Sequence, residues 1–293
     1  MRIVLAGALG EVGCSLHGAL TARGHEVWPV SARAPIDRER EVLGLPDVAH
    51  LVESGSVDVV VQAGGPGDHR EIERDHIRWS SSLLNAVSGI PAILISTTRV
   101  LEGYDQRAIE SARPRPATWY GQANAAHEQV WSSHSDSRVL RLVNFFCPPS
   151  SEASPQTNLL PWSLLLEGWH SGLISVRSAP QVAKEFVGAG DVARAIEVLA
   201  ADRSGPPVVV CGPGLTATME QLTQCAIKAC RAGGREDVAA TFGGDSPTGR
   251  GGIDAQWLTQ RGWASDMTLD RMAEEMSRWL VEWGPMIPHS GRD

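Results

Sequence analysis

The stretch RIVLAGALGEVG, residues 2–13, decides the fold class of this chain. Its apolar run leads into three glycines spaced three apart, and the segments CSLHGALTARG and HEVWPVSAR that follow are typical of a helix and a second strand. In this context the glycines allow a tight turn, the approach of backbone to a pyrophosphate, and close packing of helix on sheet. The alternative is a structural turn without a ligand. We predict that a dinucleotide binds at Gly7, Leu9, Gly10, Glu11, Val12 and Gly13.

The same alternation continues along the chain. Residues 57–65, 90–98 and 139–146 are apolar runs of strand length, and HIRWSSSLLNAV has apolar residues at helical spacing. Strands that alternate with helices predict an α/β fold built on a doubly wound parallel sheet. We expect a dinucleotide-binding domain over 1–150 and a smaller substrate-binding region over 151–293, in which 183–212 returns to the sheet.

The composition excludes several classes of function. A net charge of -8 without any basic run argues against a nucleic-acid surface. No segment reaches the roughly 18 apolar residues that a membrane helix needs, and Glu11 interrupts the apolar start where a signal peptide would continue. The five cysteines have no CxxC spacing, and no metal-ligand set surrounds the histidines. We therefore expect a cytoplasmic protein with reduced thiols and no metal.

The end of the second predicted strand indicates which dinucleotide binds. An NAD site places Asp or Glu there to bind the ribose hydroxyls. This chain instead has Ser31 and Arg33, and a guanidinium favours the 2'-phosphate of NADP through charge and paired hydrogen bonds. The alternative is a solvated surface arginine. We predict NADP, used as NADPH.

Small and polar residues follow two later strands at their carboxyl ends, where the ligands of open parallel sheets bind. Ala63, Gly64 and Gly65 would let a cofactor come close. Thr97 and Thr98 stand where chemistry would take place. The sequence thus predicts one site along this edge of the sheet.

The segment WYGQAN begins a predicted helix and places Tyr120 four positions before Asn124. The chain has only two lysines, Lys184 and Lys228. No lysine of the N-terminal region can therefore supply an ammonium group beside this tyrosine.

These motifs together resemble the extended short-chain dehydrogenase/reductase family, of the nucleotide-sugar epimerase and dehydratase type. The matching segments are GALGEVG, QAGG, ISTTRVLEGY, YGQAN, RLVNFFCPP, KEFVGAGDVARAI and RGW. The resemblance covers nearly the whole chain, implies a Rossmann-type fold and places Asn144 at the cofactor. One departure is clear, because Asn124 stands where the family's YxxxK motif has lysine.

The resemblance implies that Tyr120 protonates a carbonyl oxygen that Thr97 also binds, with Thr98 beside it. The family's lysine binds the cofactor ribose and lowers the pKa of the tyrosine, whereas Asn124 carries no charge but can still donate a hydrogen bond to a ribose hydroxyl. A phenol of ordinary pKa, near 10, stays protonated at pH 7, so ketone reduction suffers less than alcohol oxidation. Alternatively, a hydroxyl of the substrate assists protonation and Tyr120 is a bystander.

The apolar segment 158–176 contains Trp162 and Trp169 and matches the family's substrate cap, with Arg177 following it. Such a cap suits a small-molecule hydrophobic or aromatic ketone, although ordinary helix packing is the alternative. The arginine-rich, lysine-poor composition also resembles antibiotic-tailoring ketoreductases of actinobacteria, those of the angucyclinone type in particular.

We therefore expect an NADPH-dependent ketoreductase that acts on an aromatic polyketide, as a monomer or homodimer, without nucleic-acid or membrane partners. Two other functions remain open. One is a nucleotide-sugar epimerase or dehydratase. The other is a non-enzymatic regulator that senses NADP through a degenerate site.

Overall fold

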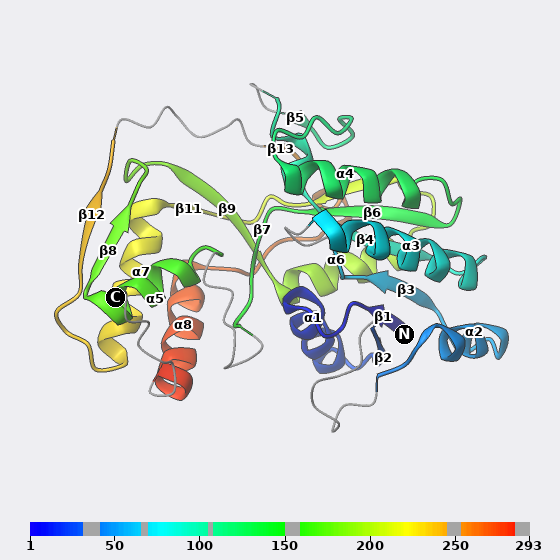
Figure 1. Ribbon diagram of the computed structural model, residues 1–293, viewed down its shortest axis with the longest axis horizontal. Coiled ribbons are helices and arrows are strands. Elements are labelled where there is room, and N and C mark those ends of the chain that lie inside the picture. Colours follow the sequence, from blue (N-terminus) through cyan, green and yellow to red (C-terminus); the bar gives the residue numbers. More distant parts are fainter. Residues whose placement is uncertain (32–41, 66–69, 105–107, 150–158, 245–252, 285–293) are drawn as a thin grey trace. The chain divides into compact units, whose positions relative to one another are not determined.

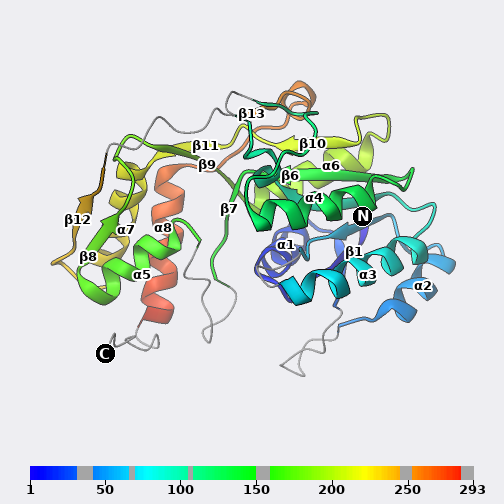
Figure 2. The ribbon, with the colours of Figure 1, turned by 45° about the horizontal axis from the view of Figure 1, so that its top comes forward.

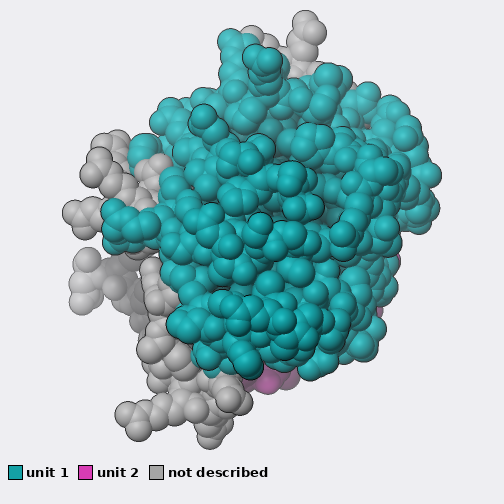
Figure 3. Space-filling model, turned by 90° about the vertical axis from the view of Figure 1, so that its right-hand side faces the viewer, with its two compact units in different colours: residues 1–143, 189–212, 250–264 teal, residues 144–188, 213–249, 265–293 magenta. Residues whose placement is uncertain are grey.

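The computed structural model of the chain describes residues 1–31, 42–65, 70–104, 108–149, 159–244 and 253–284. The chain forms two compact units, coloured separately in Figure 3. Unit 1 comprises Met1–Val143, Ala189–Gly212 and Arg250–Ala264. Unit 2 comprises Asn144–Gly188, Pro213–Gly249 and Ser265–Asp293.

Unit 1 is built on a 6-stranded sheet in the order β10-β6-β4-β3-β1-β2. All of its strand pairings are parallel. The strands are β1 (Arg2–Ala6), β2 (Glu26–Val30), β3 (Val59–Gln62), β4 (Ala92–Thr97), β6 (Ser137–Leu142) and β10 (Val208–Cys211). The predicted fold class is confirmed, because the near-continuous apolar runs of β1, β3 and β4 are those of strands buried on both faces.

Helices cover both faces of this sheet (Figure 1). On one face α1 (Glu11–Ala22) packs against α6 (Ala189–Ala201), and Glu197 of α6 accepts hydrogen bonds from Arg23 at the end of α1. On the other face α3 packs against both of its neighbours; these helices are α2 (Leu45–Glu53), α3 (Arg70–Ala86) and α4 (Trp119–Trp131). The sheet is thereby enclosed, and its carboxyl edge is left to the loops.

Short elements complete unit 1. The 3-10 turn η1 (Thr98–Leu101) follows β4, and β5 (Ala108–Ile109) pairs in parallel with β13 (Ile253–Asp254). A second 3-10 turn, η2 (Thr259–Arg261), comes shortly after. The pairing of β5 with β13 ties the segment 253–264 to the N-terminal part of the chain.

Unit 2 contains a 3-stranded sheet, a 2-stranded sheet and three helices, which Figure 2 shows in a second orientation. The first sheet joins β7 (Asn144–Phe146), β9 (Ala183–Gly188) and β11 (Leu215–Thr218), and the second joins β8 (Leu173–Val176) and β12 (Ala239–Phe242). Helix α7 packs against both others; the helices are α5 (Trp162–Ser171), α7 (Met219–Ala232) and α8 (Leu269–Trp283). Their apolar faces form a separate core.

The structure differs from the sequence-based expectations at three places. The apolar run 139–146 is one predicted strand, but it divides at Val143 into β6 and β7, which belong to different sheets. Within 183–212, β9 pairs with β7 and β11, and only β10 joins the 6-stranded sheet. The return of 250–264 to unit 1 was not predicted. Among the described residues, no helix has the length and apolar character needed to cross a membrane.

Candidate functional site

The glycine turn after β1 is held by backbone contacts that leave no space for side chains. Gly7 has a φ of 78°, and a Cβ placed on it would lie 2.2 Å from the backbone nitrogen of Gly64. A Cβ on Gly13 would lie 2.1 Å from the carbonyl oxygen of Gly7. The first and third glycines therefore have the roles that their spacing predicts, since turn, helix and the loop after β3 meet backbone to backbone.

Helix α1 starts directly from this turn. Gly10 is its N-cap residue, in an extended conformation, and as a glycine it has no side chain that could cap the helix. The first backbone N–H groups of a helix, together with its dipole, favour an anion. Because the turn is narrow, glycine-lined and uncapped, the pyrophosphate of a dinucleotide fits it, with Leu9, Glu11 and Val12 contributing backbone to the same turn.

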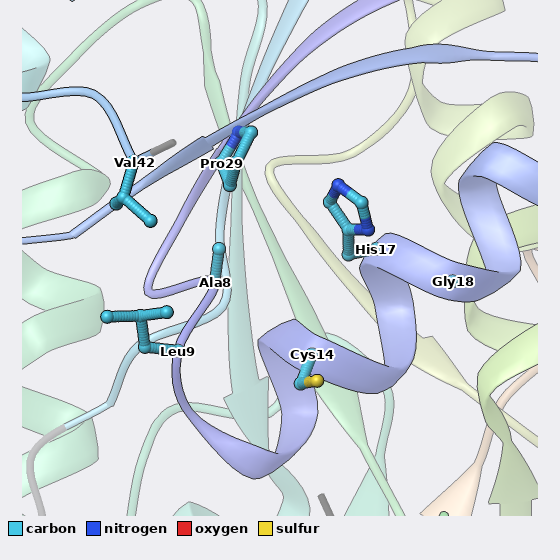
Figure 4. A pocket seen from close by; sticks show the side chains of 7 residues that line it. All are labelled: Ala8, Leu9, Cys14, His17, Gly18, Pro29 and Val42. Carbon is cyan, nitrogen blue, oxygen red and sulfur yellow. The ribbon is translucent and has the colours of Figure 1, made fainter. Parts of the chain in front are cut away.

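A cavity of about 410 Å³ adjoins the turn, between α1 and β2. Figure 4 shows Leu9 on the turn, Cys14 and His17 on α1, and Pro29 on β2 around it. The remaining lining residues are Ala8, Gly18 and Val42. Of the predicted cofactor residues, Leu9 thus lines a hollow of substantial size.

Of the two residues predicted to select NADP, the structure describes Ser31, which follows β2. Ser31 is half-buried, and its backbone N–H donates to the carbonyl oxygen of Leu43 at 3.4 Å. Arg33 lies outside the described residues. The preference between NADP and NAD therefore stays a prediction from sequence.

The end of β3 brings Gly64 against the glycine turn and leaves Gly65 exposed. Ala63 is buried beside them, and its N–H donates to the carbonyl oxygen of Ala6. Gln62, which the sequence reasoning missed, is fully buried and donates through Nε2 to the carbonyl oxygen of Gly64 at 2.8 Å. The hydrogen bond from Gln62 holds the peptide of Gly64, which meets Gly7. In the sequence, the signal for this role is a single amide residue at the end of the apolar run VVV.

The predicted hydroxyl residues lie where β4 passes into η1. Thr97 is the N-cap of η1, and its Oγ1 accepts a hydrogen bond from the N–H of Arg99 at 3.2 Å. Thr98 is the first residue of η1, and both threonines are half-buried. A Cβ on Gly121 would lie 2.7 Å from the carbonyl oxygen of Arg99, so the start of α4 packs directly on η1. The structure thus brings the threonine segment and the tyrosine segment together.

Tyr120 and Asn124 both lie in the first turns of α4, which begins after an N-cap at Thr118. Tyr120 is 36% exposed, whereas Asn124 is 3% exposed. Nδ2 of Asn124 donates to the backbone carbonyl oxygen of Tyr120 at 2.9 Å. The residue in the lysine position therefore has a neutral, buried amide whose nitrogen is already bound to its own helix.

A buried ion pair fixes α4 to the sheet one turn beyond Asn124. Arg141 of β6 donates to Glu128 of α4 through Nε at 3.0 Å and Nη2 at 2.8 Å. Ser96 of β4 donates to the same carboxylate at 2.7 Å. The Arg141 and Glu128 side chains are 1% and 4% exposed. Because the pair is bidentate and buried, it sets the position of α4 relative to the residue that precedes Thr97.

A second polar contact joins α4 to α3. The hydroxyl of Ser80 accepts a hydrogen bond from the indole N–H of Trp131 at 2.8 Å and lies 2.7 Å from Nε2 of His127. Burial, and then the neighbouring His76, lower the pKa of His127 from 6.5 to about 3. His127 is therefore neutral at pH 7, and its Nε2 shares a hydrogen bond with the Ser80 hydroxyl.

The remaining predicted residues belong to unit 2. Asn144 begins β7, is exposed, and donates through Nδ2 to the carbonyl oxygen of Glu185 at 2.8 Å. Trp162 is 3% exposed, stacks on Phe146 at 5.4 Å between ring centroids, and meets Trp279 edge to face. The structure therefore packs Trp162 in the core of unit 2, and its predicted substrate contact stays a prediction.

The other two predicted substrate residues are more accessible. Trp169 is half-buried against the core of unit 2, and Arg177 is exposed just after β8. The roles of Trp169 and Arg177 toward a substrate stay predictions. Within the described part of the chain, no cluster of three or more His, Cys, Asp or Glu side chains could hold a metal ion.

Comparison with known proteins decides the family. Residues 3–212 match the NAD dependent epimerase/dehydratase family. The chain belongs to this family. The match runs from β1 to the segment after β10, so it includes the glycine turn, both threonines and the start of α4. Membership places the chain among oxidoreductase-type enzymes of a nicotinamide-dinucleotide-dependent family.

Individual members of the family extend the comparison. The dTDP-6-deoxy-L-talose 4-dehydrogenase (NAD(P)(+)) of Kitasatospora kifunensis is 27% identical over 261 residues, which cover 78% of each chain. The dTDP-glucose 4,6-dehydratase DesIV of Streptomyces venezuelae, solved with NAD, has a TM-score of 0.74 at 18% identity, covering 98% of this chain and 100% of its own. MoeE5, solved with UDP-glucose and NAD, has a TM-score of 0.73 at 19% identity, covering 96% and 99%. The two structures share the fold of this chain.

These relatives favour the nucleotide-sugar alternative over the aromatic polyketide substrate expected from the sequence. Each is described by its name or its bound molecules as a protein of nucleotide-linked sugars. None supports an aromatic polyketide as substrate, nor the resemblance to angucyclinone ketoreductases. The family-level resemblance to nucleotide-sugar epimerases and dehydratases is confirmed.

Proposed function

We propose that this protein is a nicotinamide-dinucleotide-dependent reductase of a keto group on a nucleotide-linked deoxysugar. The observation that carries the proposal is Asn124, a buried neutral amide in the position of the family's lysine. It leaves the neighbouring phenol without an ammonium group on α4. The name of the Kitasatospora relative supports the substrate class, since a sugar 4-dehydrogenase run in reverse reduces a 4-keto sugar.

The residues of the site have distinct tasks in such a reaction. The glycine turn and the start of α1 would bind the pyrophosphate, and the loop at Gly64 and Gly65 would leave room for the rest of the dinucleotide. When bound, the reduced cofactor supplies a hydride to the carbonyl carbon. The protein then needs a proton donor for the carbonyl oxygen.

Tyr120 is the proposed donor, and Thr97 or Thr98 the proposed hydrogen-bond partner of the oxygen. An ordinary phenol has a pKa near 10 and is protonated at pH 7, which is the form a donor requires. Tyr120 is 36% exposed, so its side chain is partly open to solvent. Because reduction consumes the protonated phenol, we expect the reduction rate to fall as pH rises through the pKa of that phenol.

NADPH is the proposed reduced cofactor. The proposal rests on Ser31 and Arg33 in place of the acidic residue that would bind the ribose hydroxyls of NAD. The relative's name includes both forms of the cofactor, so family membership leaves the preference open.

A turnover assay tests the proposal. Purified protein is mixed with NADPH or NADH and either a thymidine-diphosphate-linked 4-keto-6-deoxyhexose or a panel of aromatic ketones, and loss of the reduced cofactor is followed by absorbance. We expect turnover with the nucleotide-linked sugar and NADPH. Turnover with aromatic ketones alone would restore the polyketide function, and cofactor binding without any turnover would indicate a regulator.

Tyr120→Phe is the matched variant, because it removes one hydroxyl from an accessible side chain. We expect a loss of about 100-fold or more in the reduction rate, the usual contribution of a general acid. A loss below about tenfold, or about 1.4 kcal/mol, would make Tyr120 a bystander and favour protonation assisted by a substrate hydroxyl.

A further inference from the structure

Glu102 is a buried carboxylate that has no part in the reaction proposed above. It is the C-cap residue of η1, and its side chain is 7% exposed. Its carboxylate forms an ion pair with Arg99 of η1 and accepts a hydrogen bond from Oγ1 of Thr118 at 2.9 Å. The carboxylate therefore connects the 3-10 turn after β4 to the residue that caps α4.

The hydrogen bonds of Thr118 have a fixed direction. A carboxylate can only accept, so the hydroxyl proton of Thr118 points to Glu102. The hydroxyl oxygen in turn accepts a hydrogen bond from the N–H of Gly121 at 3.3 Å, which completes the N-cap of α4. Glu102 thereby orients the side chain that starts the helix carrying Tyr120.

The same 3-10 turn holds a threonine of the candidate site. The N–H of Arg99 donates to Oγ1 of Thr97 at 3.2 Å, which leaves the hydroxyl proton of Thr97 for another acceptor. The guanidinium of the same arginine pairs with Glu102. Thr97 and Thr118 are thus linked to each other through Arg99 and Glu102.

Stability alone does not explain a carboxylate at this position. Removing a carboxylate from water costs free energy, and a buried ion pair often stabilises a fold no more than apolar residues of similar volume. The backbone already joins the two segments, since the N–H of Gly103 donates to the carbonyl oxygen of Arg115 at 2.6 Å, and the N–H of Arg115 to that of Val100 at 2.7 Å. The contribution of Glu102 is one of orientation.

We propose that Glu102 is a positioning residue, which fixes the start of α4 relative to η1 so that Tyr120 and Thr97 reach the same carbonyl oxygen. The inference rests on the proposed function, because it takes Tyr120 as the proton donor. A general acid must lie within hydrogen-bond reach of the atom that it protonates, and a misplacement of about 1 Å can cost about 100-fold in rate. Loss of the carboxylate should therefore lower kcat more than it changes KM.

Glu102→Gln tests the inference with little change of shape. The amide oxygen can still accept the hydrogen bond from Thr118, but the amide has no charge to pair with Arg99. With a thymidine-diphosphate-linked 4-keto-6-deoxyhexose and reduced cofactor, we expect kcat to fall by about tenfold or more, while calorimetry finds the dinucleotide Kd unchanged. Glu197→Gln is the matched control, because Glu197 pairs with Arg23 at the end of α1, and it should retain the wild-type kcat.

Thr118 provides a second test from the other end of the link. Thr118→Val keeps the shape of the side chain and removes its hydroxyl, so we expect kcat to fall as in Glu102→Gln. Thr118→Ser keeps the hydroxyl and should restore most of the wild-type kcat. The loss of one helix cap is small beside the stability of a domain, and circular dichroism checks that each variant is folded.

Tyr120→Phe separates positioning from a general weakening of the protein. If Glu102 acts through Tyr120, then Glu102→Gln should change the residual rate of Tyr120→Phe by no more than about twofold. An additive effect would overturn the inference, and so would a kcat of Glu102→Gln equal to that of the wild type. Should Glu102→Gln fail to fold, the comparison of Thr118→Val with Thr118→Ser decides the matter.

The outcomes also separate this inference from the proposed function. If the wild-type protein does not reduce the keto sugar, the proposed function fails, and the inference with it. If Tyr120→Phe keeps the wild-type rate, the proposed donor and the inference fail, while the reductase function stands. If Tyr120→Phe loses activity and Glu102→Gln does not, only the inference is overturned.

Discussion

Lowering the pH should reduce the free energy of unfolding through His127, which lies at the contact between α3 and α4. Burial and the neighbouring His76 lower the pKa of His127 to about 3, while the same side chain in the unfolded chain titrates near 6.5. Below pH 6.5 the unfolded chain therefore binds a proton that the folded chain does not, so protons favour unfolding. The free energy of unfolding falls by about 1.4 kcal/mol per pH unit until the folded pKa is reached.

The size of the stability loss depends on the pH range over which it is measured. Between pH 8 and pH 5 His127 stays neutral in the folded protein and becomes protonated in the unfolded chain, which removes about 2 kcal/mol of stability. His127→Gln removes this contribution, because a glutamine amide can still form a hydrogen bond with Ser80 and has no proton to gain. We expect the variant to lose about 2 kcal/mol less than wild type between the two pH values.

Urea unfolding followed by circular dichroism at pH 8, 6.5 and 5 measures this difference. His50→Gln is the control, since His50 is exposed at the end of α2, and it should retain the wild-type dependence. An equal loss of stability in wild type and His127→Gln would refute the reasoning. It would mean that His127 already takes up its proton in the folded protein.

Four further predictions address the site. Gly13→Ala places a methyl group 2.1 Å from a backbone carbonyl oxygen, so we expect calorimetry to detect no dinucleotide binding in a variant that remains folded. Arg141→Met leaves the Glu128 carboxylate buried without its partner, and we expect a loss of about 3–5 kcal/mol in urea unfolding. Arg33→Ala should weaken NADPH binding by about tenfold or more and leave NADH binding unchanged, as fluorescence titration would show. Asn124→Lys lowers the pKa of the adjacent phenol, so the reduction rate should decline with rising pH from a lower pH than in wild type. An unchanged pH profile would contradict the last prediction.

The parts of the fold that depend on backbone chemistry were predictable from the sequence. Gly7 and Gly13 are needed because no side chain fits the turn. The spacing of the glycines after an apolar run was enough to predict this turn. The parallel sheet followed from apolar runs long enough for buried strands. The division of 139–146 at Val143 was not predictable, because an apolar run does not show which of two sheets its halves will join.

The buried polar contacts of α4 could not be predicted from the sequence. Glu128 and Arg141 are ordinary charged residues in sequence, and only the packing of α4 on β6 makes them a buried pair. Ser80 and His127 are similarly separated along the chain. The sequence left Trp162 open between substrate contact and core packing, because aromatic residues suit both, and its stacking on Phe146 and edge contact with Trp279 appear only in the structure.

Glu110 connects parts of unit 1 that lie far apart in the sequence. Its carboxylate accepts hydrogen bonds from the backbone N–H groups of Val210 at 2.7 Å and Trp257 at 3.2 Å, while its carbonyl oxygen faces the Arg141 guanidinium. During synthesis on the ribosome, Val210 and Trp257 emerge long after Glu110. The carboxylate can therefore exchange its bound water for these two protein donors only after the chain has twice returned from unit 2 to unit 1.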